Sequence, residues 1–298
     1  MEQPQSRWQV RTGRSMIVFM LLFSMLLSTA SGVLAASEPT VFALTNGNQL
    51  LRFNESRPDR IQGQLTLSGL AEGEQMLGID FRPATGQLFG LSSASKLYVI
   101  DPASGAVTAV GSAFAIPLNY TSEIGFDFNP TVDRIRIVTD NGQNLRANPD
   151  TGAVVDTDPN TPAIDPDGSL AYAATDSNAG QQPNVVGAAY TNNFAGATTT
   201  VLYAIDSDLD ILTTQDPPNA GTLNTVGSLR VDASDVVGFD IFSDEDGDNA
   251  RAAIRQGSNN QSHFYTVDLT SGRARMKSKG TIGGGQVIRD IAIASSPS

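Results

Sequence analysis

A short segment that begins with glycine recurs along this chain. The copies read GIDF at Gly78, GFDF at Gly125, GAAY at Gly187 and GFDI at Gly238, with RDIAIA from Arg289 as a degenerate fifth copy. After a copy come short segments in which apolar and polar residues alternate, separated by turns rich in Gly, Asp and Pro. Such alternation is typical of β-strands, and four strands repeated every ~50 residues are typical of a β-propeller blade. No stretch shows helical periodicity.

The two ends of the repeat region predict how the ring closes. Three strand-like segments lie within Val41–Leu70, before GIDF, and one lies at Val287–Ala294, after the last unit. Together they make a fifth blade that the two termini share, and this pairing removes the open sheet edges. The sequence therefore predicts an all-β fold, a β-propeller of five four-stranded blades, with the C-terminal strand paired to N-terminal strands.

One polar stretch, Asp156–Pro183, leaves the number of blades open. If SLAYAA (Ser169–Ala174) is the fourth strand of the second unit, the ring has five blades. If the stretch contains further strands, the ring has six.

The N-terminal segment has the features of a secretory signal peptide. Arg7, Arg11 and Arg14 form a basic region, the apolar run Met16–Leu27 follows, and small residues lead to a cleavage site after Ala35. The apolar run is short for a membrane span, which needs ~20 residues, so an uncleaved anchor is the alternative. We expect a signal peptide at residues 1–35, a single propeller domain at 36–298, and a location in the periplasm or outside the cell.

Composition narrows the classes of partner and chemistry. The chain carries 19 basic and 31 acidic side chains, a net charge of −12, and has no basic run. Phosphate contacts need Lys and Arg, so we expect no nucleic-acid partner, and we expect no membrane span once the signal is removed. There is no cysteine, and His263 is the only histidine, so neither a zinc cluster nor a cysteine nucleophile is available.

The aspartate of the repeated motif is the first candidate site. Asp80, Asp127 and Asp240 occupy one position of the repeat, whereas Ala189 fills it in the third unit and Ala292 in the fifth. If these segments are the innermost strands, three carboxylates approach the central channel. Three readings stay open: the carboxylates join neighbouring blades by accepting backbone hydrogen bonds, they hold a cation, or they take part in catalysis.

An acidic turn is the second candidate site. In SDEDGDN, the oxygen-bearing residues Asp244, Asp246, Asp248 and Asn249 surround Gly247, an arrangement that suits calcium. The glycine comes too early in the loop for an EF-hand and no glutamate closes the loop, so a solvated hairpin is the alternative. A longer acidic stretch from Asp156 to Asp167 has the same ambiguity. Calcium is the candidate cofactor.

Several long segments carry a resemblance to a known family. GIDFRPATGQLFGL, GFDFNPTVDRIRIVTDNGQNLRANPDTG, AYTNN, QDPPNAGTLNTVG and VGFDI occur in order along the chain. Together they resemble a family of secreted bacterial proteins known as a domain of unknown function, number 4394 among such domains. The resemblance covers roughly Thr40 to Ala294 and implies an exported, propeller-like domain. It implies no activity and no catalytic residues.

Three functions follow as hypotheses. The favoured one is an exported, non-catalytic propeller that acts as a binding or interaction scaffold for an unknown protein or polysaccharide, because propeller loops form variable surfaces on a rigid ring. The second is a glycoside hydrolase based on two carboxylates, or another calcium-assisted hydrolase. The third is a structural protein of the envelope or matrix. A Ser-His-Asp triad would have to use His263, which lies in no recognisable catalytic motif.

Overall fold

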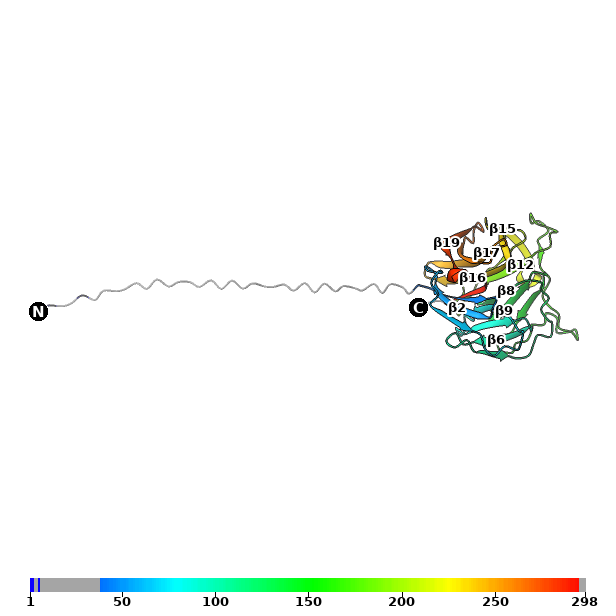
Figure 1. Ribbon diagram of the computed structural model, residues 1–298, viewed down its shortest axis with the longest axis horizontal. Coiled ribbons are helices and arrows are strands. Elements are labelled where there is room, and N and C mark those ends of the chain that lie inside the picture. The colour runs from blue at the N-terminus through cyan, green and yellow to red at the C-terminus, as the bar shows by residue number, and fades with distance from the viewer. Residues whose placement is uncertain (3–4, 6–37, 295–298) are drawn as a thin grey trace. The chain divides into compact units, whose positions relative to one another are not determined.

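The computed structural model describes residues 1–2, 5 and 38–294 (Figure 1). Nearly all of the signal peptide predicted at residues 1–35 lies outside the described residues. Within the described part, no helix is both long and apolar enough to cross a membrane. Everything that follows concerns the unit formed by residues 38–294.

These residues fold into five sheets arranged as the blades of a propeller, and the strands are antiparallel except for one short parallel pair in blade 3 (Figure 1). Blade 1 contains β4 (Met76–Phe81), β5 (Leu88–Ser92), β6 (Lys96–Ile100) and β7 (Val107–Val110). Blade 2 contains β8 (Ile124–Asn129), β9 (Arg134–Thr139) and β10 (Asn144–Ala147). Blade 3 contains β12 (Val185–Tyr190), β13 (Leu202–Asp206), β14 (Ile211–Gln215) and β15 (Thr222–Ser228), and β11 (Ala171–Tyr172) joins its outer edge.

The last two blades complete the ring. Blade 4 contains β16 (Ala233–Asp244), β17 (Gly247–Gln256), β18 (Ser262–Val267) and β19 (Ala274–Thr281). Blade 5 contains β20 (Ile288–Ala294), β1 (Thr40–Thr45), β2 (Gln49–Asn54) and β3 (Gly63–Thr66). Two short 3₁₀ turns, η1 (Pro218–Ala220) and η2 (Ile282–Gly284), lie in the connections.

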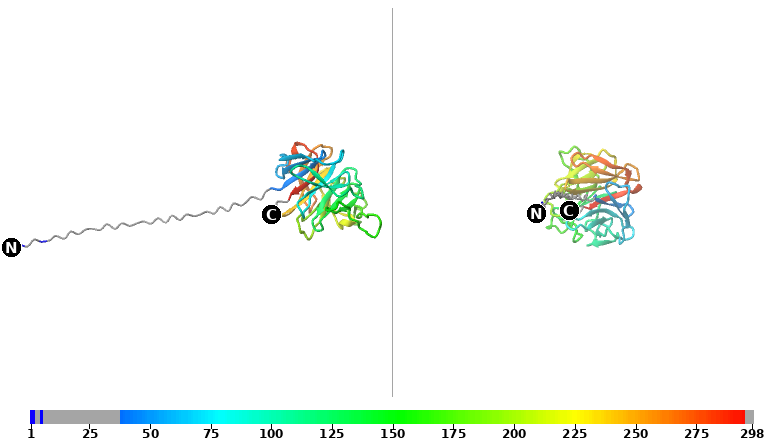
Figure 2. Two further views of the ribbon diagram at one scale, coloured as in Figure 1. Left: turned by 90° about the horizontal axis from the view of Figure 1, so that it is seen from below. Right: turned by 90° about the vertical axis from the view of Figure 1, so that its left-hand side faces the viewer.

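Blade 5 closes the ring as the sequence predicts. The C-terminal strand β20 pairs with β1 in antiparallel register, so that Val41 faces Ile293 and Ala43 faces Ile291. Figures 1 and 2 show this red strand beside the blue N-terminal strands. The prediction of a five-bladed propeller closed by its two termini is confirmed.

The fourth strand of blade 2 differs from the expectation. SLAYAA contributes β11, which pairs in parallel with β15 of blade 3, Tyr172 lying opposite Leu223. Tyr172 is buried there, and its hydroxyl donates a hydrogen bond of 2.6 Å to Asp206 Oδ2. Blade 2 keeps three strands and a single bridge between Ala147 and Val154. The short apolar pattern of SLAYAA does not specify which sheet edge accepts it, and Tyr172 finds its polar partner in blade 3.

Candidate functional site

The three motif aspartates meet at the centre of the ring. Asp80 lies on β4, Asp127 on β8 and Asp240 on β16, the strands that begin blades 1, 2 and 4. Each side chain offers an oxygen that lies within 4.8 Å of those offered by the other two. Each of the three residues is 1% exposed. The structure therefore brings together the carboxylates that the repeat placed at equivalent positions.

Each of these aspartates also joins its blade to the next one. Asp80 Oδ2 accepts a hydrogen bond from the backbone N–H of Phe128 at 2.8 Å, and Asp127 Oδ1 accepts one from Tyr190 at 3.1 Å. Asp240 Oδ2 accepts one from Ile293 at 2.6 Å. In every case the donor directly follows the equivalent position of the neighbouring blade. The motif aspartates therefore have a structural role: each one links the innermost strands of two neighbouring blades.

A fourth buried carboxylate belongs to Asp290, which was not among the candidate residues predicted from the sequence. It lies on β20, where its Oδ2 accepts a hydrogen bond of 2.8 Å from the N–H of Ile79 in blade 1. When the fifth copy is aligned with the others, Asp290 occupies the position of the motif glycine. The position of the motif aspartate is then filled by Ala292, which has no carboxylate. The signal was present in RDIAIA as an acidic residue shifted by two positions, which keeps it on the same face of the strand.

Burial raises the pKa of all four carboxyl groups. Loss of solvent is the largest cause for Asp80 and Asp127, and the neighbouring carboxylates of the cluster raise the pKa of both further. Desolvation raises the pKa of Asp240 to about 7, and it raises that of Asp290 well above its ordinary value. Three negative charges this close cannot persist without compensation, so the cluster takes up either protons or a cation.

The glycine that precedes each motif aspartate sets the distance between blades. A Cβ at Gly78 would lie 2.6 Å from the Cβ of Phe126, and a Cβ at Gly125 would lie 2.7 Å from that of Ala188. Both contacts reach the inner strand of the next blade. The glycines therefore let the strands approach closely enough for the aspartates to reach their backbone donors.

The predicted calcium hairpin forms the exposed turn between β16 and β17. Asp244, Asp246 and Asp248 are exposed, and Asn249 is half-buried. Asp244 Oδ1 accepts hydrogen bonds from the Asp246 N–H at 2.9 Å and from Asn249 Nδ2 at 3.0 Å. Asp248 Oδ1 accepts one of 2.7 Å from Ser243 Oγ. Within the described residues, the axial trio is the one group of three or more acidic or histidine side chains close enough to share an ion. Calcium at this hairpin stays a prediction.

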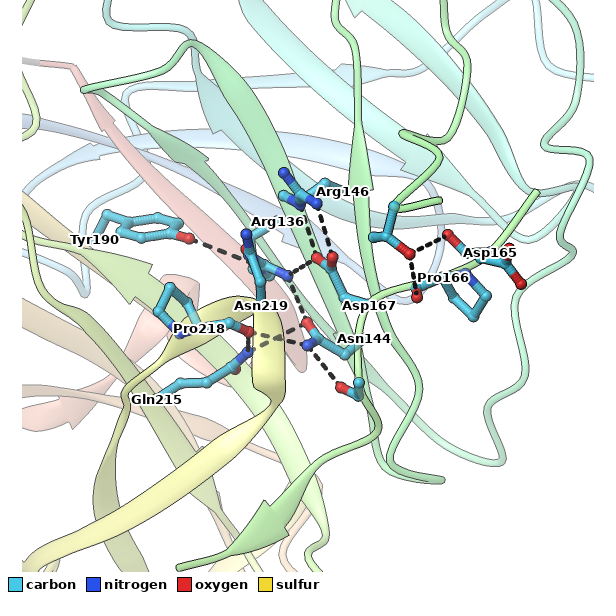
Figure 3. Close-up of polar contacts among 12 residues, drawn as sticks. Arg136, Asn144, Arg146, Asp165, Pro166, Asp167, Tyr190, Gln215, Pro218 and Asn219 are labelled. Atoms are coloured by element: carbon cyan, nitrogen blue, oxygen red, sulfur yellow. Dashed lines mark hydrogen bonds and ion pairs between the residues drawn. The ribbon is translucent and has the colours of Figure 1, made fainter. Parts of the chain in front are cut away.

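The second acidic stretch contributes a different kind of site. Asp158 is exposed, but Asp167 is buried and faces two arginines (Figure 3). Asp167 Oδ2 lies 2.6 Å from Arg136 Nη1, and Arg146 donates from Nε and Nη2 to the two carboxylate oxygens, both at 2.8 Å. Asp167 thus forms a bidentate pair with Arg146 and a second ion pair with Arg136.

The buried guanidinium of Arg136 is held from several sides. Its Nη1 also donates to Asn144 Oδ1 at 2.7 Å, and its Nη2 donates to Asn219 Oδ1 at 2.7 Å. Its Nε lies 3.4 Å from the Tyr190 hydroxyl. Arg136 is 1% exposed. Figure 3 shows these side chains converging from β9, β10, β12 and η1.

A pocket of about 410 Å³ opens beside this network, between blades 2 and 3. Its wall contains three arginines and no acidic side chain; its lining is Asn129, Val132, Arg134, Arg136, Arg146, Val155, Tyr190, Pro218 and Asn219. A neighbouring pocket of about 360 Å³ shares Arg146, Val155 and Asn219 with it. The sequence analysis missed this site because its residues come from separate turns and strands with no common motif.

The remaining sequence candidate, His263, lies on β18 and is half-buried. Its Nδ1 has no hydrogen-bond partner among the described residues. No serine or carboxylate in that part of the chain is bonded to it, so the described geometry contains no catalytic triad around His263.

Comparisons with curated proteins and with solved structures come first. No curated protein matches the chain. Among solved structures, a hydrazine synthase of Kuenenia stuttgartiensis is 12% identical with a TM-score of 0.38; the match covers 72% of this chain and 51% of that one, so the chain spans about half its length. A structure of a nidogen/laminin complex is 11% identical, with a TM-score of 0.47. The match covers 87% of this chain and 99% of that one. A Bacteroides thetaiotaomicron protein of unknown function is 17% identical, with a TM-score of 0.47 and coverage of 88% and 68%.

The match to a family model is of a different kind, because it rests on the sequence itself. The model is described as a domain of unknown function, DUF4394, and it matches residues 49–292. This range includes all four axial carboxylates and the arginine-lined pocket, and the chain therefore belongs to the DUF4394 family.

Proposed function

We propose that this protein is an exported, non-catalytic propeller that binds a small oxyanion-bearing ligand in the pocket between blades 2 and 3. The observation that carries the proposal is the pocket wall, which contains Arg134, Arg136 and Arg146 and no acidic residue. The ligand class is a small molecule with a carboxylate, phosphate or sulfate group, and an acidic saccharide belongs to it.

The charge balance at this pocket favours an anion. Asp167 offsets one of the three guanidinium charges, which leaves an excess of positive charge in a chain whose net charge is −12. A positive pocket on an acidic surface attracts an anion locally while the rest of the surface repels it. The sign of the ligand's charge therefore follows from the arginines.

The arginines have separate roles in this proposal. Arg136 is fully engaged with Asp167, Asn144 and Asn219, so it forms a rigid base for the pocket. In the described part of the chain, Arg146 donates hydrogen bonds from Nε and Nη2, which leaves Nη1 for a ligand. Arg134 is half-buried and donates from Nη1 to the carbonyl oxygen of Asp133. A guanidinium held in place loses little entropy when it binds an oxyanion.

The size of the pocket agrees with a small-molecule ligand. A volume of about 410 Å³ lies in the range of ~300–1,000 Å³ that such sites occupy. The neighbouring pocket shares Arg146 but is also lined by Asp156 and Asp167, so the oxyanion belongs in the first pocket. Preformed walls with a few fixed polar groups are the usual arrangement of a binding site.

The carboxylate arrangement does not favour the hydrolase hypothesis. A glycosidase needs two carboxyl groups that a substrate can reach, spaced ~5–10 Å apart. The axial trio is 1% exposed, and Asp167 is already paired with two arginines. Export rests on the predicted signal peptide, and it is tested by reading the N-terminus of the protein recovered from the periplasm or medium, which should begin at Ala36.

Isothermal titration of the mature protein with glucuronate, inorganic phosphate and sulfate tests the proposed ligand class, with glucose as the neutral control. We expect at least one oxyanion to bind and glucose to give no heat. Arg134→Ala and Arg146→Gln should weaken binding by roughly tenfold each, because each removes a charge-assisted hydrogen bond. The matched control is Arg273→Ala, an exposed arginine of blade 4, which should bind as the wild type does. Equal binding by all variants, or heat from glucose alone, contradicts the proposal.

A further inference from the structure

We propose that Asp80, Asp127 and Asp240 hold one divalent cation of the size of calcium at the axis of the propeller, where it ties blades 1, 2 and 4 together. This site lies away from the oxyanion pocket and does not depend on the proposed function. The ligand is the free metal ion.

The spacing of the oxygens matches a calcium ion. Calcium binds oxygen at ~2.3–2.6 Å, so two oxygens on one ion are at most about 5 Å apart. The three axial carboxylates offer oxygens within 4.8 Å of one another, close to the ~4.0–4.5 Å that separates three oxygens spaced evenly around one calcium ion. Magnesium, with bonds of ~2.0–2.1 Å, would need the three side chains to draw closer together. Backbone hydrogen bonds already hold them in place, which favours the larger ion.

A buried oxygen without a partner is the second observation. Asp240 Oδ1 makes no hydrogen bond of good geometry among the described residues, although the backbone N–H of Ile241 acts on this carboxylate and lowers its pKa, and Asp240 is 1% exposed. Its Oδ2 accepts the Ile293 N–H. A buried carboxylate oxygen that lacks a donor is costly unless something binds it, and a cation at the axis meets that need.

Among the described residues, no arginine or lysine forms an ion pair with the trio. Arg251, the arginine that acts on Asp240, directs its Nε to Glu55 at 2.7 Å. Arg289, on the innermost strand of blade 5, directs its Nε to Glu123 at 3.1 Å. The charges of both arginines are thus committed to other carboxylates. The negative charge of the three clustered aspartates is therefore compensated by protons or by a cation bound at the axis, and we propose the cation.

A small pocket lies at one end of the inner strands; Arg82 lines it, and none of the three aspartates does. Its volume is about 110 Å³, and its wall includes Phe81, which follows Asp80, and Ile293, whose N–H binds Asp240. Asn193 also lines it, and Asn193 Oδ1 is buried without a partner. The space suffices for a few waters at ~30 Å³ each. Calcium takes six to eight ligands, so water molecules would have to complete the shell begun by the three carboxylates.

The test measures metal content and thermal stability on the mature protein. After dialysis against calcium and removal of free ions, mass spectrometry should find one calcium per chain in the wild type and none in Asp127→Asn. Calcium at a hundredfold excess over Kd should raise the Tm of the wild type by roughly 5–10 °C over the chelator-treated protein. Magnesium should raise it less. The asparagine keeps an oxygen for the Tyr190 N–H, so the variant retains the link between blades 2 and 3.

Two control variants separate this site from other acidic groups. Asp290→Asn removes a buried carboxylate outside the trio and should keep the calcium response. Asp244→Asn alters the exposed hairpin and should keep it as well. A calcium response that disappears in Asp244→Asn but survives in Asp127→Asn places the ion at the hairpin and overturns the proposal. Absence of bound calcium and of any Tm shift in the wild type also overturns it. If Asp127→Asn does not fold, Asp80→Asn is measured in its place. The number of calcium ions bound per wild-type chain tests the proposal without any variant.

Discussion

The carboxylate of Asp290 accepts the backbone N–H of Ile79 at 2.8 Å, joining the innermost strand of the last blade to that of the first. These two residues lie at opposite ends of the propeller sequence. Together with the links that Asp80, Asp127 and Asp240 make, this bond leaves only the junction of blades 3 and 4 without an axial aspartate link. There Asn184 Nδ2 donates to Asp235 Oδ1 at 3.1 Å, and the Asn192 N–H donates to Asp248 Oδ1 at 2.8 Å.

The link made by Asp290 should be measurable as stability. Asp290→Ala leaves the buried N–H of Ile79 without an acceptor, whereas Asp290→Asn keeps an oxygen in place. We expect the alanine variant to be less stable than the asparagine variant by about 1–3 kcal/mol, the cost of an unsatisfied buried donor. Urea unfolding of the two variants at one pH gives this difference directly. Equal stabilities would mean that the hydrogen bond contributes nothing to ring closure.

Gly78→Ala should destabilise the junction of blades 1 and 2. The new Cβ would lie 2.6 Å from the Cβ of Phe126, so the two inner strands must separate. Overpacking of this kind costs about 3 kcal/mol, which exceeds the gain of ~0.5–1 kcal/mol from replacing glycine in a strand. Gly47→Ala is the matched control, because the nearest atom to its Cβ is 3.7 Å away. A thermal melt that ranks the two variants alike would argue against tight packing at the axis.

Glu123 should make the protein less stable as the pH rises. It is 3% exposed, and burial is the largest cause that raises its pKa to about 7 from the ordinary 4.5. Between these two values the folded protein binds more protons than the unfolded chain, so the free energy of unfolding falls with increasing pH. Glu123→Gln removes this dependence and can still accept the hydrogen bond from Arg289.

We therefore expect Glu123→Gln to gain about 1–3 kcal/mol over the wild type between pH 5 and pH 8. Urea unfolding of both proteins at several pH values measures the gain. The comparison with the wild type cancels the contribution of the other buried carboxyl groups. Glu72→Gln, at an exposed position, should show a constant difference from the wild type. A constant difference for Glu123→Gln would contradict the assignment.

Asp167→Asn should be among the most destabilising single changes near the pocket. It removes the only carboxylate that pairs with Arg136 in the described structure and leaves that guanidinium buried. Breaking a buried ion pair from one side costs about 3 kcal/mol. Asp158→Asn, in the same loop but exposed, should change stability by less than ~0.5 kcal/mol. Differential scanning calorimetry compares them, and similar melts for the two variants would show that Asp167 is not a structural ion-pair partner.

The repeat determined most of the architecture. Equivalent positions in a repeated blade occupy equivalent places in the ring, so the sequence predicted five blades, closure by the termini and three aspartates at the axis. The register of the repeat also explains why Asp290 was missed, since it occupies the glycine position of its unit. The outermost strands could not be assigned to blades from the sequence. SLAYAA is a short apolar pattern that fits the edge of either blade 2 or blade 3. It lies in blade 3, where the buried Tyr172 contacts Asp206.

The sequence alone determined what repeats within a blade, because strand alternation and turn residues are local properties of the chain. The tertiary structure decided what lies between blades. Arg136, Arg146, Asp167 and Tyr190 share no motif, and they form one polar network beside the pocket only because two neighbouring blades and a long loop bring them together. Likewise, the repeat named the three axial aspartates, but their burial and mutual distance depend on the packing of strands distant in sequence. Electrostatic consequences such as raised pKa values follow from that packing, since burial removes water from groups that would otherwise be solvated.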